Sequence, residues 1–211
     1  MVRIPLNLVF AVCVALCAAA ITAAQATPFE DGKRAWEKGD YATAFHYWEP
    51  LAMNGEPDAE NGLGSLYELG QVVGQDDVEA IYWYRKAAAK GFDKAEYNLG
   101  RVYRMGHGVS TDESLAFHYF MLAAVQGYGP AQNAVAEAYA FGFGVAEDDV
   151  VAYAWFTVAY ANAPSALKPS IDADMYYLLL HTSADKIEEA RRIAARCIQS
   201  HYQDCGRSGP E

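Results

Sequence analysis

The chain has few basic residues for its size. Lys and Arg number 16 against 27 Asp and Glu, which gives a net charge of −11. Arg3 is the only charged residue among the first 26, so the balance from residue 27 onward is 15 to 27, or −12. Nucleic acids and anionic lipid surfaces both require a basic protein surface. We therefore expect neither as a partner.

Long apolar runs are also scarce. The only one, residues 6–21, is about 16 residues long, which is shorter than the ~20 that a membrane-spanning helix needs. Arg3 precedes the run and Ala24-Gln25-Ala26 follows it. A basic start, an apolar middle and an A-x-A site are typical of a secretory signal peptide. We predict cleavage after residue 26 and export to a bacterial periplasm, with a retained membrane anchor as the alternative.

Cysteine is rare, and two of the four cysteines lie in the N-terminal segment. Valine or leucine precedes each of these two, which disfavours a lipidation site. Cys197 and Cys205 remain, eight positions apart. A close pair in an oxidising compartment is usually a disulfide. Free thiols are one alternative, and a zinc site with His201 and Asp204 as further ligands is another, although zinc needs four well-placed donors.

Sequence motifs for catalysis or cofactor binding are missing. The five histidines show no H-E-x-x-H spacing, and no P-loop, dinucleotide fingerprint or EF-hand loop occurs. The pattern Ser-x-x-Lys begins at Ser165 and at Ser183, but the companion motifs S-D-N and K-T-G of serine β-lactamases are absent. We predict no metal, no cofactor and no enzyme activity. A hydrolase acting on cell-wall or β-lactam substrates is kept as the alternative.

Apolar residues make up 53% of the chain, which includes 15 tyrosines, so it is too hydrophobic to be disordered. Within it, three segments repeat with a step of 36 residues: 59–67, 95–103 and 131–139. Each contains apolar residues at i, i+4 and i+8, as in Ala95, Leu99 and Tyr103, which indicates one face of a helix. A regular step of this length is typical of a stacked-repeat architecture.

The second half of each unit keeps the same register. A glycine-rich turn such as Gly106-His107-Gly108 supplies the positive φ of a sharp reversal. An acidic residue then begins the second helix, where negative charge favours the positive end of the helix dipole. Glycine at position 100 removes a side chain, so the second helix can approach the first closely. Each unit is therefore predicted to be a helix pair that completes its core by stacking on its neighbours.

These patterns, Ala-x-x-x-Leu-Gly-x-x-Tyr, Gly-x-Gly-Val-x-x-Asp and Ala-x-x-Trp-Tyr-x-x-Ala-Ala-x-x-Gly, resemble the Sel1-like repeat, a relative of the tetratricopeptide repeat. The resemblance implies an all-α solenoid of stacked helix pairs in a right-handed superhelix. Residue 72 departs from the pattern, because valine stands where the second glycine of the turn would be. The predicted organisation is a signal peptide (1–26), a tetratricopeptide-like unit (27–58), three Sel1-like repeats (59–94, 95–130, 131–166) and C-terminal capping helices with a tail (167–211).

In this family the first helices of successive units line a concave groove that commonly holds a peptide or partner domain. The resemblance therefore implies a non-catalytic exported adaptor that binds a protein or peptide. Arg101 and Arg104 share one helix face and could hold a partner carboxylate. The alternative is that they pair with acidic residues of adjacent helices. The groove positions that flank the packed stripe are Asn61, Ser65, Glu68, Tyr97, Asn98, Arg101, Arg104, Asn133, Glu137 and Phe141.

Overall fold

The structure is a computed structural model that describes residues 27–72 and 74–206, so the predicted signal peptide lies outside the described residues. These residues form ten helices and no strand, which confirms the predicted all-α solenoid. The helices are α2 (Pro28–Glu37), α3 (Tyr41–Met53), α4 (Pro57–Leu69), α5 (Asp77–Ala88), α6 (Asp93–Met105), α7 (Glu113–Ala124), α8 (Gly129–Phe141), α9 (Asp149–Asn162), α10 (Lys168–His181) and α11 (Ala184–Gln199).

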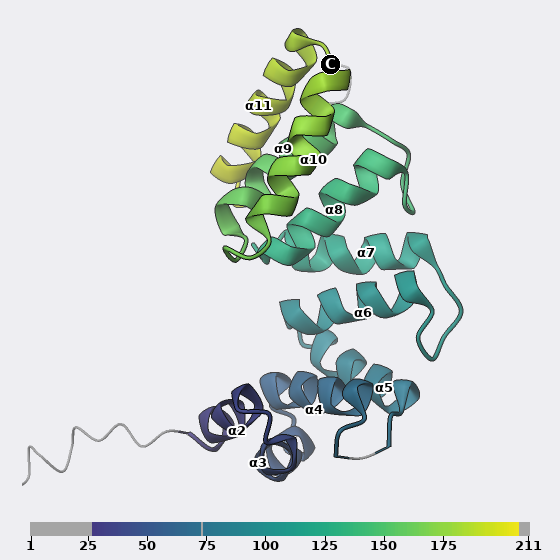
Figure 1. Ribbon diagram of the computed structural model, residues 1–211, viewed down its shortest axis with the longest axis vertical. Coiled ribbons are helices and arrows are strands. Elements are labelled where there is room, and N and C mark those ends of the chain that lie inside the picture. The colour runs from purple at the N-terminus through teal and green to yellow at the C-terminus, as the bar shows by residue number, and fades with distance from the viewer. Residues whose placement is uncertain (1–26, 73, 207–211) are drawn as a thin grey trace, which may run out of the picture.

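The helices stack as consecutive pairs. α2 packs on α3, α4 on α5, α6 on α7 and α8 on α9, and each second helix also packs on the first helix of the next pair. Figure 1 shows the stack rising from α2 and α3 to α9, with the long α4–α5, α6–α7 and α8–α9 connections along one edge. The even-numbered helices α2, α4, α6 and α8 are the first helices of their pairs. They are the elements that the family resemblance assigns to the binding groove.

The repeated apolar stripe forms the core, as predicted. Leu63, Leu99 and Val135, each 36 residues from the next, are almost completely buried. Glycine at position 100 is needed for the close approach of α7, because a Cβ there would lie 2.5 Å from the ring of Phe120. Tyr103 is buried at the end of the same stripe. The sequence spacing therefore identified both the buried face and the reason for its glycine.

The long turns are closed by glycine and aspartate. Gly142 ends α8 with φ of 73°, a left-handed conformation that favours glycine. Gly144 lies so close to the preceding unit that an added Cβ would clash with the backbone of Glu113. In the α6–α7 turn, Asp112 caps α7, because its side chain accepts a hydrogen bond from the backbone N–H of Leu115 at 2.9 Å. Side-chain capping adds to the dipole interaction that was predicted for these acidic positions.

Each of the three 36-residue units also contains a polar pair with a buried acceptor and an exposed donor, which we call a clasp. The clasp joins the start of the first helix to the end of the second helix of the same unit. The carboxylate of Glu60 is fully buried and both its oxygens lie 2.7 Å from the Lys90 ammonium. In the second unit, 36 residues further along, the Gln126 amide donates to the Glu96 carboxylate at 2.6 Å. In the third unit, the Asn162 amide donates to the Gln132 side-chain oxygen at 2.9 Å.

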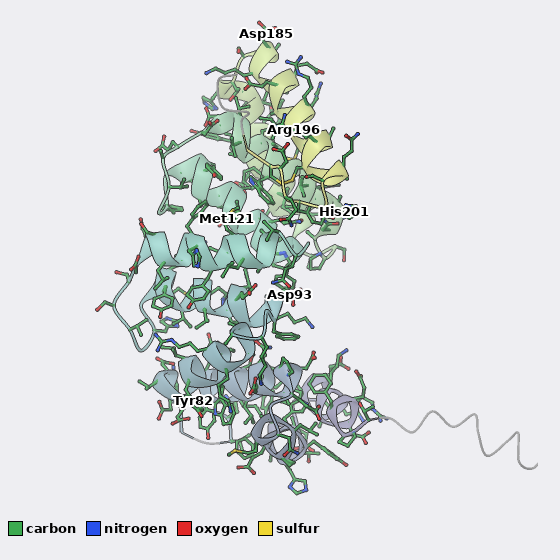
Figure 2. The ribbon with its side chains drawn as sticks, turned by 180° about the vertical axis from the view of Figure 1, so that it is seen from behind. Tyr82, Asp93, Met121, Asp185, Arg196 and His201 are labelled. Carbon is green, nitrogen blue, oxygen red and sulfur yellow. A yellow bond between two sulfur atoms is a disulfide. The ribbon has the colours of Figure 1, made fainter. Side chains whose placement is uncertain are left out.

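The last two helices leave this regular pattern. Both α10 and α11 pack on α9. α11 begins after Ser183, whose side chain makes no capping hydrogen bond. Seen from behind, Figure 2 places Asp185, near the start of α11, at the opposite end of the stack from Tyr82 on α5.

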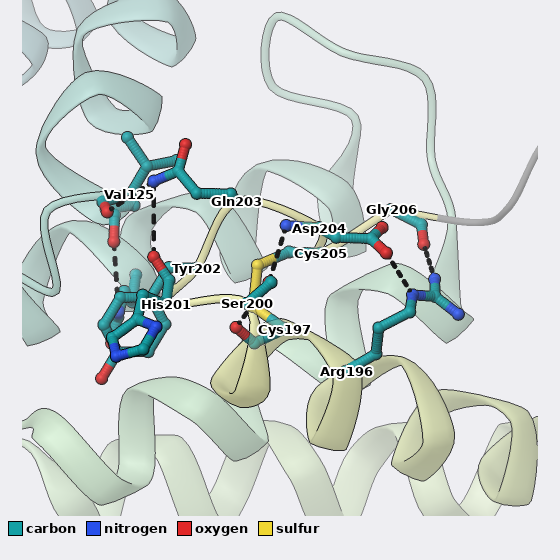
Figure 3. The surroundings of a disulfide bond; sticks show 12 residues. Val125, Arg196, Cys197, Ser200, His201, Tyr202, Gln203, Asp204, Cys205 and Gly206 are labelled. Carbon is teal, nitrogen blue, oxygen red and sulfur yellow. Dashed lines mark hydrogen bonds and ion pairs between the residues drawn. A yellow bond between two sulfur atoms is a disulfide. The ribbon is translucent and has the colours of Figure 1, made fainter.

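The chain after α11 turns back on the stack (Figure 3). Cys197 and Cys205 form a disulfide with their Cα atoms 4.4 Å apart, so their sulfurs are paired with each other instead of binding zinc. Arg196 holds the same turn through an ion pair of 2.8 Å to Asp204. The Tyr202 hydroxyl accepts a hydrogen bond from Asn162 at 2.9 Å. The disulfide therefore fastens the tail against the last complete repeat.

Candidate partner-binding face

The predicted groove residues lie on three successive first helices, α4, α6 and α8, and hydrogen bonds connect one helix to the next. The Asn98 amide donates to the Asn61 side-chain oxygen at 2.9 Å, which joins α6 to α4. On α8, the Asn133 amide donates to the Glu137 carboxylate at 2.6 Å. The structure thus brings most of the predicted positions into one continuous polar row.

Arg101 and Arg104 do not project freely into solvent. Arg101 forms an ion pair of 3.2 Å with Glu68 on α4, and Arg104 forms one of 3.2 Å with Glu137 on α8. All four side chains are partly exposed. The Tyr84 hydroxyl donates to the other oxygen of Glu68 at 2.7 Å. The structure therefore favours the alternative that the arginines pair with neighbouring acidic residues.

Tyr97 occupies the centre of the row. Its ring packs on Phe120 and on Tyr128, with centroids 5.6 and 5.3 Å apart. Burial raises the pKa of the Tyr97 hydroxyl, and the positive charges of Arg101 and Arg104 oppose that rise. Tyr97 therefore stays a neutral hydrogen-bonding group at physiological pH.

Phe141 stands apart from the row. It ends α8 and exposes 44% of its surface. Its ring lies 5.8 Å from that of Phe143 in the following turn. These two rings form a small exposed aromatic group near the edge that carries the long turns.

A hollow of about 340 Å³ lies at the N-terminal end of this face. Its lining comes from three first helices, α2, α4 and the start of α6, and from Trp48 on the second helix α3. We call it the aromatic hollow; the aromatic residues that line it are Phe29, Trp36, Trp48 and Phe92. Asn61 and Ser65, two of the predicted groove residues, complete one wall.

Glycines on two helices shape the aromatic hollow. A Cβ at Gly32 would lie 2.5 Å from the Trp48 ring, and one at Gly62 would lie 2.6 Å from it. The indole of Trp48 can occupy this space only because both side chains are missing. Its Nε1–H donates to the Phe29 carbonyl at 3.2 Å, which fixes the orientation of the ring. Lys33 and Lys94 line the same hollow and are exposed.

The sequence analysis missed the aromatic part of this site. Tryptophans at helical spacing usually belong to a core, and Trp48 is indeed buried. The signal that could have found the hollow is the pair of glycines that face the tryptophan from α2 and α4. Phe92 contributes only because the chain curves back toward α2, which spacing along the sequence does not reveal.

The structure places the serines and the possible metal ligands of the described residues. It contains no group of three or more His, Cys, Asp or Glu side chains placed to hold a metal ion in this part of the chain. Ser165 lies exposed in the α9–α10 connection and Ser183 lies exposed just before α11, so neither is in an enclosed site. None of the described helices is long and apolar enough to cross a membrane.

The family model for the Sel1 repeat matches residues 29–56, 57–92, 93–128 and 129–163. Because these matches cover more than half of its length, the chain belongs to the Sel1 repeat family. Proteins of this family are typically adaptors or scaffolds that mediate interactions between proteins. A search of curated proteins found no match.

Two solved structures are similar to the chain. One is a Sel1 repeat protein from Oxalobacter formigenes, with a TM-score of 0.65 and 27% identity over 72% of this chain and 59% of that chain. The other is a protective antigen with an SLR fold from uropathogenic Escherichia coli, with a TM-score of 0.54 and 24% identity over 87% of this chain and 49% of that chain. The second likeness supports the fold alone. This chain spans about half to three fifths of the length of these two proteins.

Proposed function

We propose that this protein is an exported adaptor without catalytic activity that binds a protein or peptide along its first helices. The aromatic hollow is the observation that carries the proposal. It is large enough to receive a side chain of a partner, and it opens beside amide and carboxylate groups that can bond to a peptide backbone. Apolar pockets with a few polar groups at the edge are the usual anchor points of interfaces.

Mutation of the hollow tests the binding proposal. We expect Phe92→Ala to reduce capture of the partner by about tenfold or more, because it removes one aromatic wall. Tyr82→Ala is the matched control, since Tyr82 is an exposed aromatic residue on α5 that does not line the hollow. Pull-down from a periplasmic extract, followed by titration of the captured protein, provides the measurement. Equal binding by the two variants would place the interface elsewhere, and the exposed rings of Phe141 and Phe143 would be examined next.

The arginines are tested separately, because they already have acidic neighbours. Replacing both Arg101 and Arg104 with glutamine removes two charges and leaves a hydrogen-bond donor for Glu68 and Glu137. If a partner carboxylate binds there, the double variant should lose affinity and the parent should bind more weakly at higher salt. Unchanged affinity in both measurements would mean that the arginines only join adjacent helices.

The export part of the proposal depends on residues 1–26. Their basic start, apolar run and Ala24-Gln25-Ala26 site support cleavage that leaves Thr27 at the N-terminus. Mass spectrometry of the protein from a periplasmic fraction measures this directly. Recovery of an intact chain that begins at Met1 in the membrane fraction would contradict export as a cleaved protein.

A further inference from the structure

α10 is apolar on two opposite sides. Ile171 and Leu178 are buried against the core, whereas Tyr176 and Leu180 on the other side each expose 63% of their surface. A helix in water normally presents a polar face opposite its buried stripe, and a helix that is apolar all round is usually covered on both sides. The outer side of α10 therefore has the composition of a packing surface.

The position of α10 in the stack explains which neighbour it lacks. α8 packs both on α7, which precedes it, and on α9, which completes its pair. α10 follows α9 in the same way, but the next helix, α11, packs on α9 instead of completing a pair with α10. Figure 1 shows α10 in front of α9, with no described helix laid over its outward side. The place that a second helix would take is open among the described residues.

The outer side of α10 carries a regular seam: Pro169, Ala173, Tyr176 and Leu180. The steps are four, three and four residues, which is the spacing of the interface positions in a coiled coil. The order of these steps is the same whether the helix is read from its N-terminus or from its C-terminus. In an antiparallel pair of identical helices, Tyr176 of one copy therefore lies over Ala173 of the other, and Leu180 lies over Pro169. Each layer sets a large residue against a smaller one, as a self-complementary twofold interface requires.

The exposed area is sufficient for a reversible dimer. The four large exposed side chains are Tyr176, Tyr177, Leu179 and Leu180. From their exposed fractions they present roughly 450 Å² of mainly apolar surface per copy. Two copies with their flanking residues would bury about 1,000–1,200 Å², which is near the lower end for specific interfaces. An interface of this size is typical of weak, reversible contacts, so we expect the dimer to dissociate on dilution.

We propose that the protein forms a twofold dimer in which α10 pairs antiparallel with α10 of a second copy. In the dimer, α10 of each copy covers the outer side of α10 in the other copy, where a second helix of the pair would otherwise lie. Each α10 is then packed on α9 on one side and on the second copy on the other. The seam residues of this interface lie on α10 and are distinct from the residues of α2, α4, α6 and α8 that form the partner-binding face.

Sedimentation velocity of the purified protein over a range of concentrations tests the dimer. The parent should change from monomer to dimer, and the double variant Tyr176→Glu, Leu180→Glu should raise the dissociation constant by about 100-fold or more. Tyr82→Glu is the matched control, since Tyr82 is 51% exposed on α5 and should leave the dimer intact. Circular dichroism checks that all variants remain folded. A parent that stays monomeric at about 1 mM, or a double variant that still dimerises, would overturn the proposal.

Cysteine pairing tests the antiparallel register. Pro169→Cys and Leu180→Cys are placed in separate chains, and each variant is oxidised alone and then as a mixture. Because residues 169 and 180 are about 16 Å apart along a helix, neither variant should link to itself in the antiparallel pair, whereas the mixture should form a 169–180 disulfide. Mass spectrometry identifies the linked peptides. Self-linking of either variant, or no linking in the mixture, would refute this pairing.

Discussion

Lys90→Ala would remove the cation of the first clasp while leaving its buried carboxylate in place. Glu60 has no solvent-exposed surface, and Lys90 provides its two shortest ionic contacts. The same ammonium donates to the Gly55 carbonyl at 2.7 Å, in the turn before α4. The substitution therefore affects both the start of the first helix and the end of the second helix in this unit.

The expected loss follows from the partial burial of the pair. Removing one partner of a fully buried ion pair costs about 3–5 kcal/mol. The Lys90 side chain is 38% exposed here, and Lys86 stays 3.5 Å from the same carboxylate. Water and Lys86 can therefore compensate part of the charge, and we expect a loss of about 2–3 kcal/mol.

The third repeat supplies the matched control. Its clasp joins Gln132 to Asn162 without any charge, at the positions equivalent to Glu60 and Lys90. The double variant Glu60→Gln, Lys90→Asn copies this neutral clasp and should unfold within about 1 kcal/mol of the parent, because it buries no unpaired charge.

Urea unfolding combined with native-state hydrogen exchange measures both effects, since single units of a repeat array can open separately. The amides of α4 and α5 should lose protection in Lys90→Ala and regain it in the double variant. A loss below about 0.5 kcal/mol in the single variant would show that solvent already screens Glu60. A double variant as unstable as the single one would refute the equivalence of the clasps.

Three further predictions concern the core, pH and the tail. Leu99→Ala should cost about 2–5 kcal/mol in urea unfolding, whereas Leu69→Ala, at a position that is 44% exposed, should cost less than about 1 kcal/mol. Burial raises the pKa of the Glu96 carboxyl above its unfolded value, so the stability associated with its protonated form is present at low pH and is lost as pH rises through the folded pKa. Glu96→Gln should therefore stabilise the protein at neutral pH and flatten the dependence of its melting temperature on pH in thermal scans, whereas a steeper dependence would contradict this. Cys205→Ser should cost about 2 kcal/mol and increase amide exchange around Tyr202, because the eight-residue link that fastens the tail is lost.

Much of this fold could be predicted from the sequence, because similar residues recur at the same position of each repeat. Leu99 and Tyr103 recur every 36 residues as large apolar side chains, so their burial and the pairing of helices could be predicted. The glycine at position 100 has one local reason, the close approach of Phe120. Packing of this kind depends on neighbours within one unit, and the sequence displays it directly.

The clasps could not be predicted in the same way, because their positions repeat while their chemistry changes. A lysine, a glutamine and an asparagine all bond to the start of the first helix. The aromatic hollow was missed because it combines Trp36 with Phe92, which are brought together only by the curvature of the stack. In α10, the outer stripe is exposed because α11 packs on α9, and spacing along the sequence does not reveal that path.

The partner-binding face offers two surfaces of different energetic value. A partner carboxylate that approached Arg101 or Arg104 would have to replace an existing ion pair, so it would exchange one partly solvated contact for another. A side chain that entered the aromatic hollow would instead remove apolar surface of both molecules from water, without breaking a bond. We therefore expect the hollow to supply most of the affinity and the polar row to determine which sequence can lie beside it.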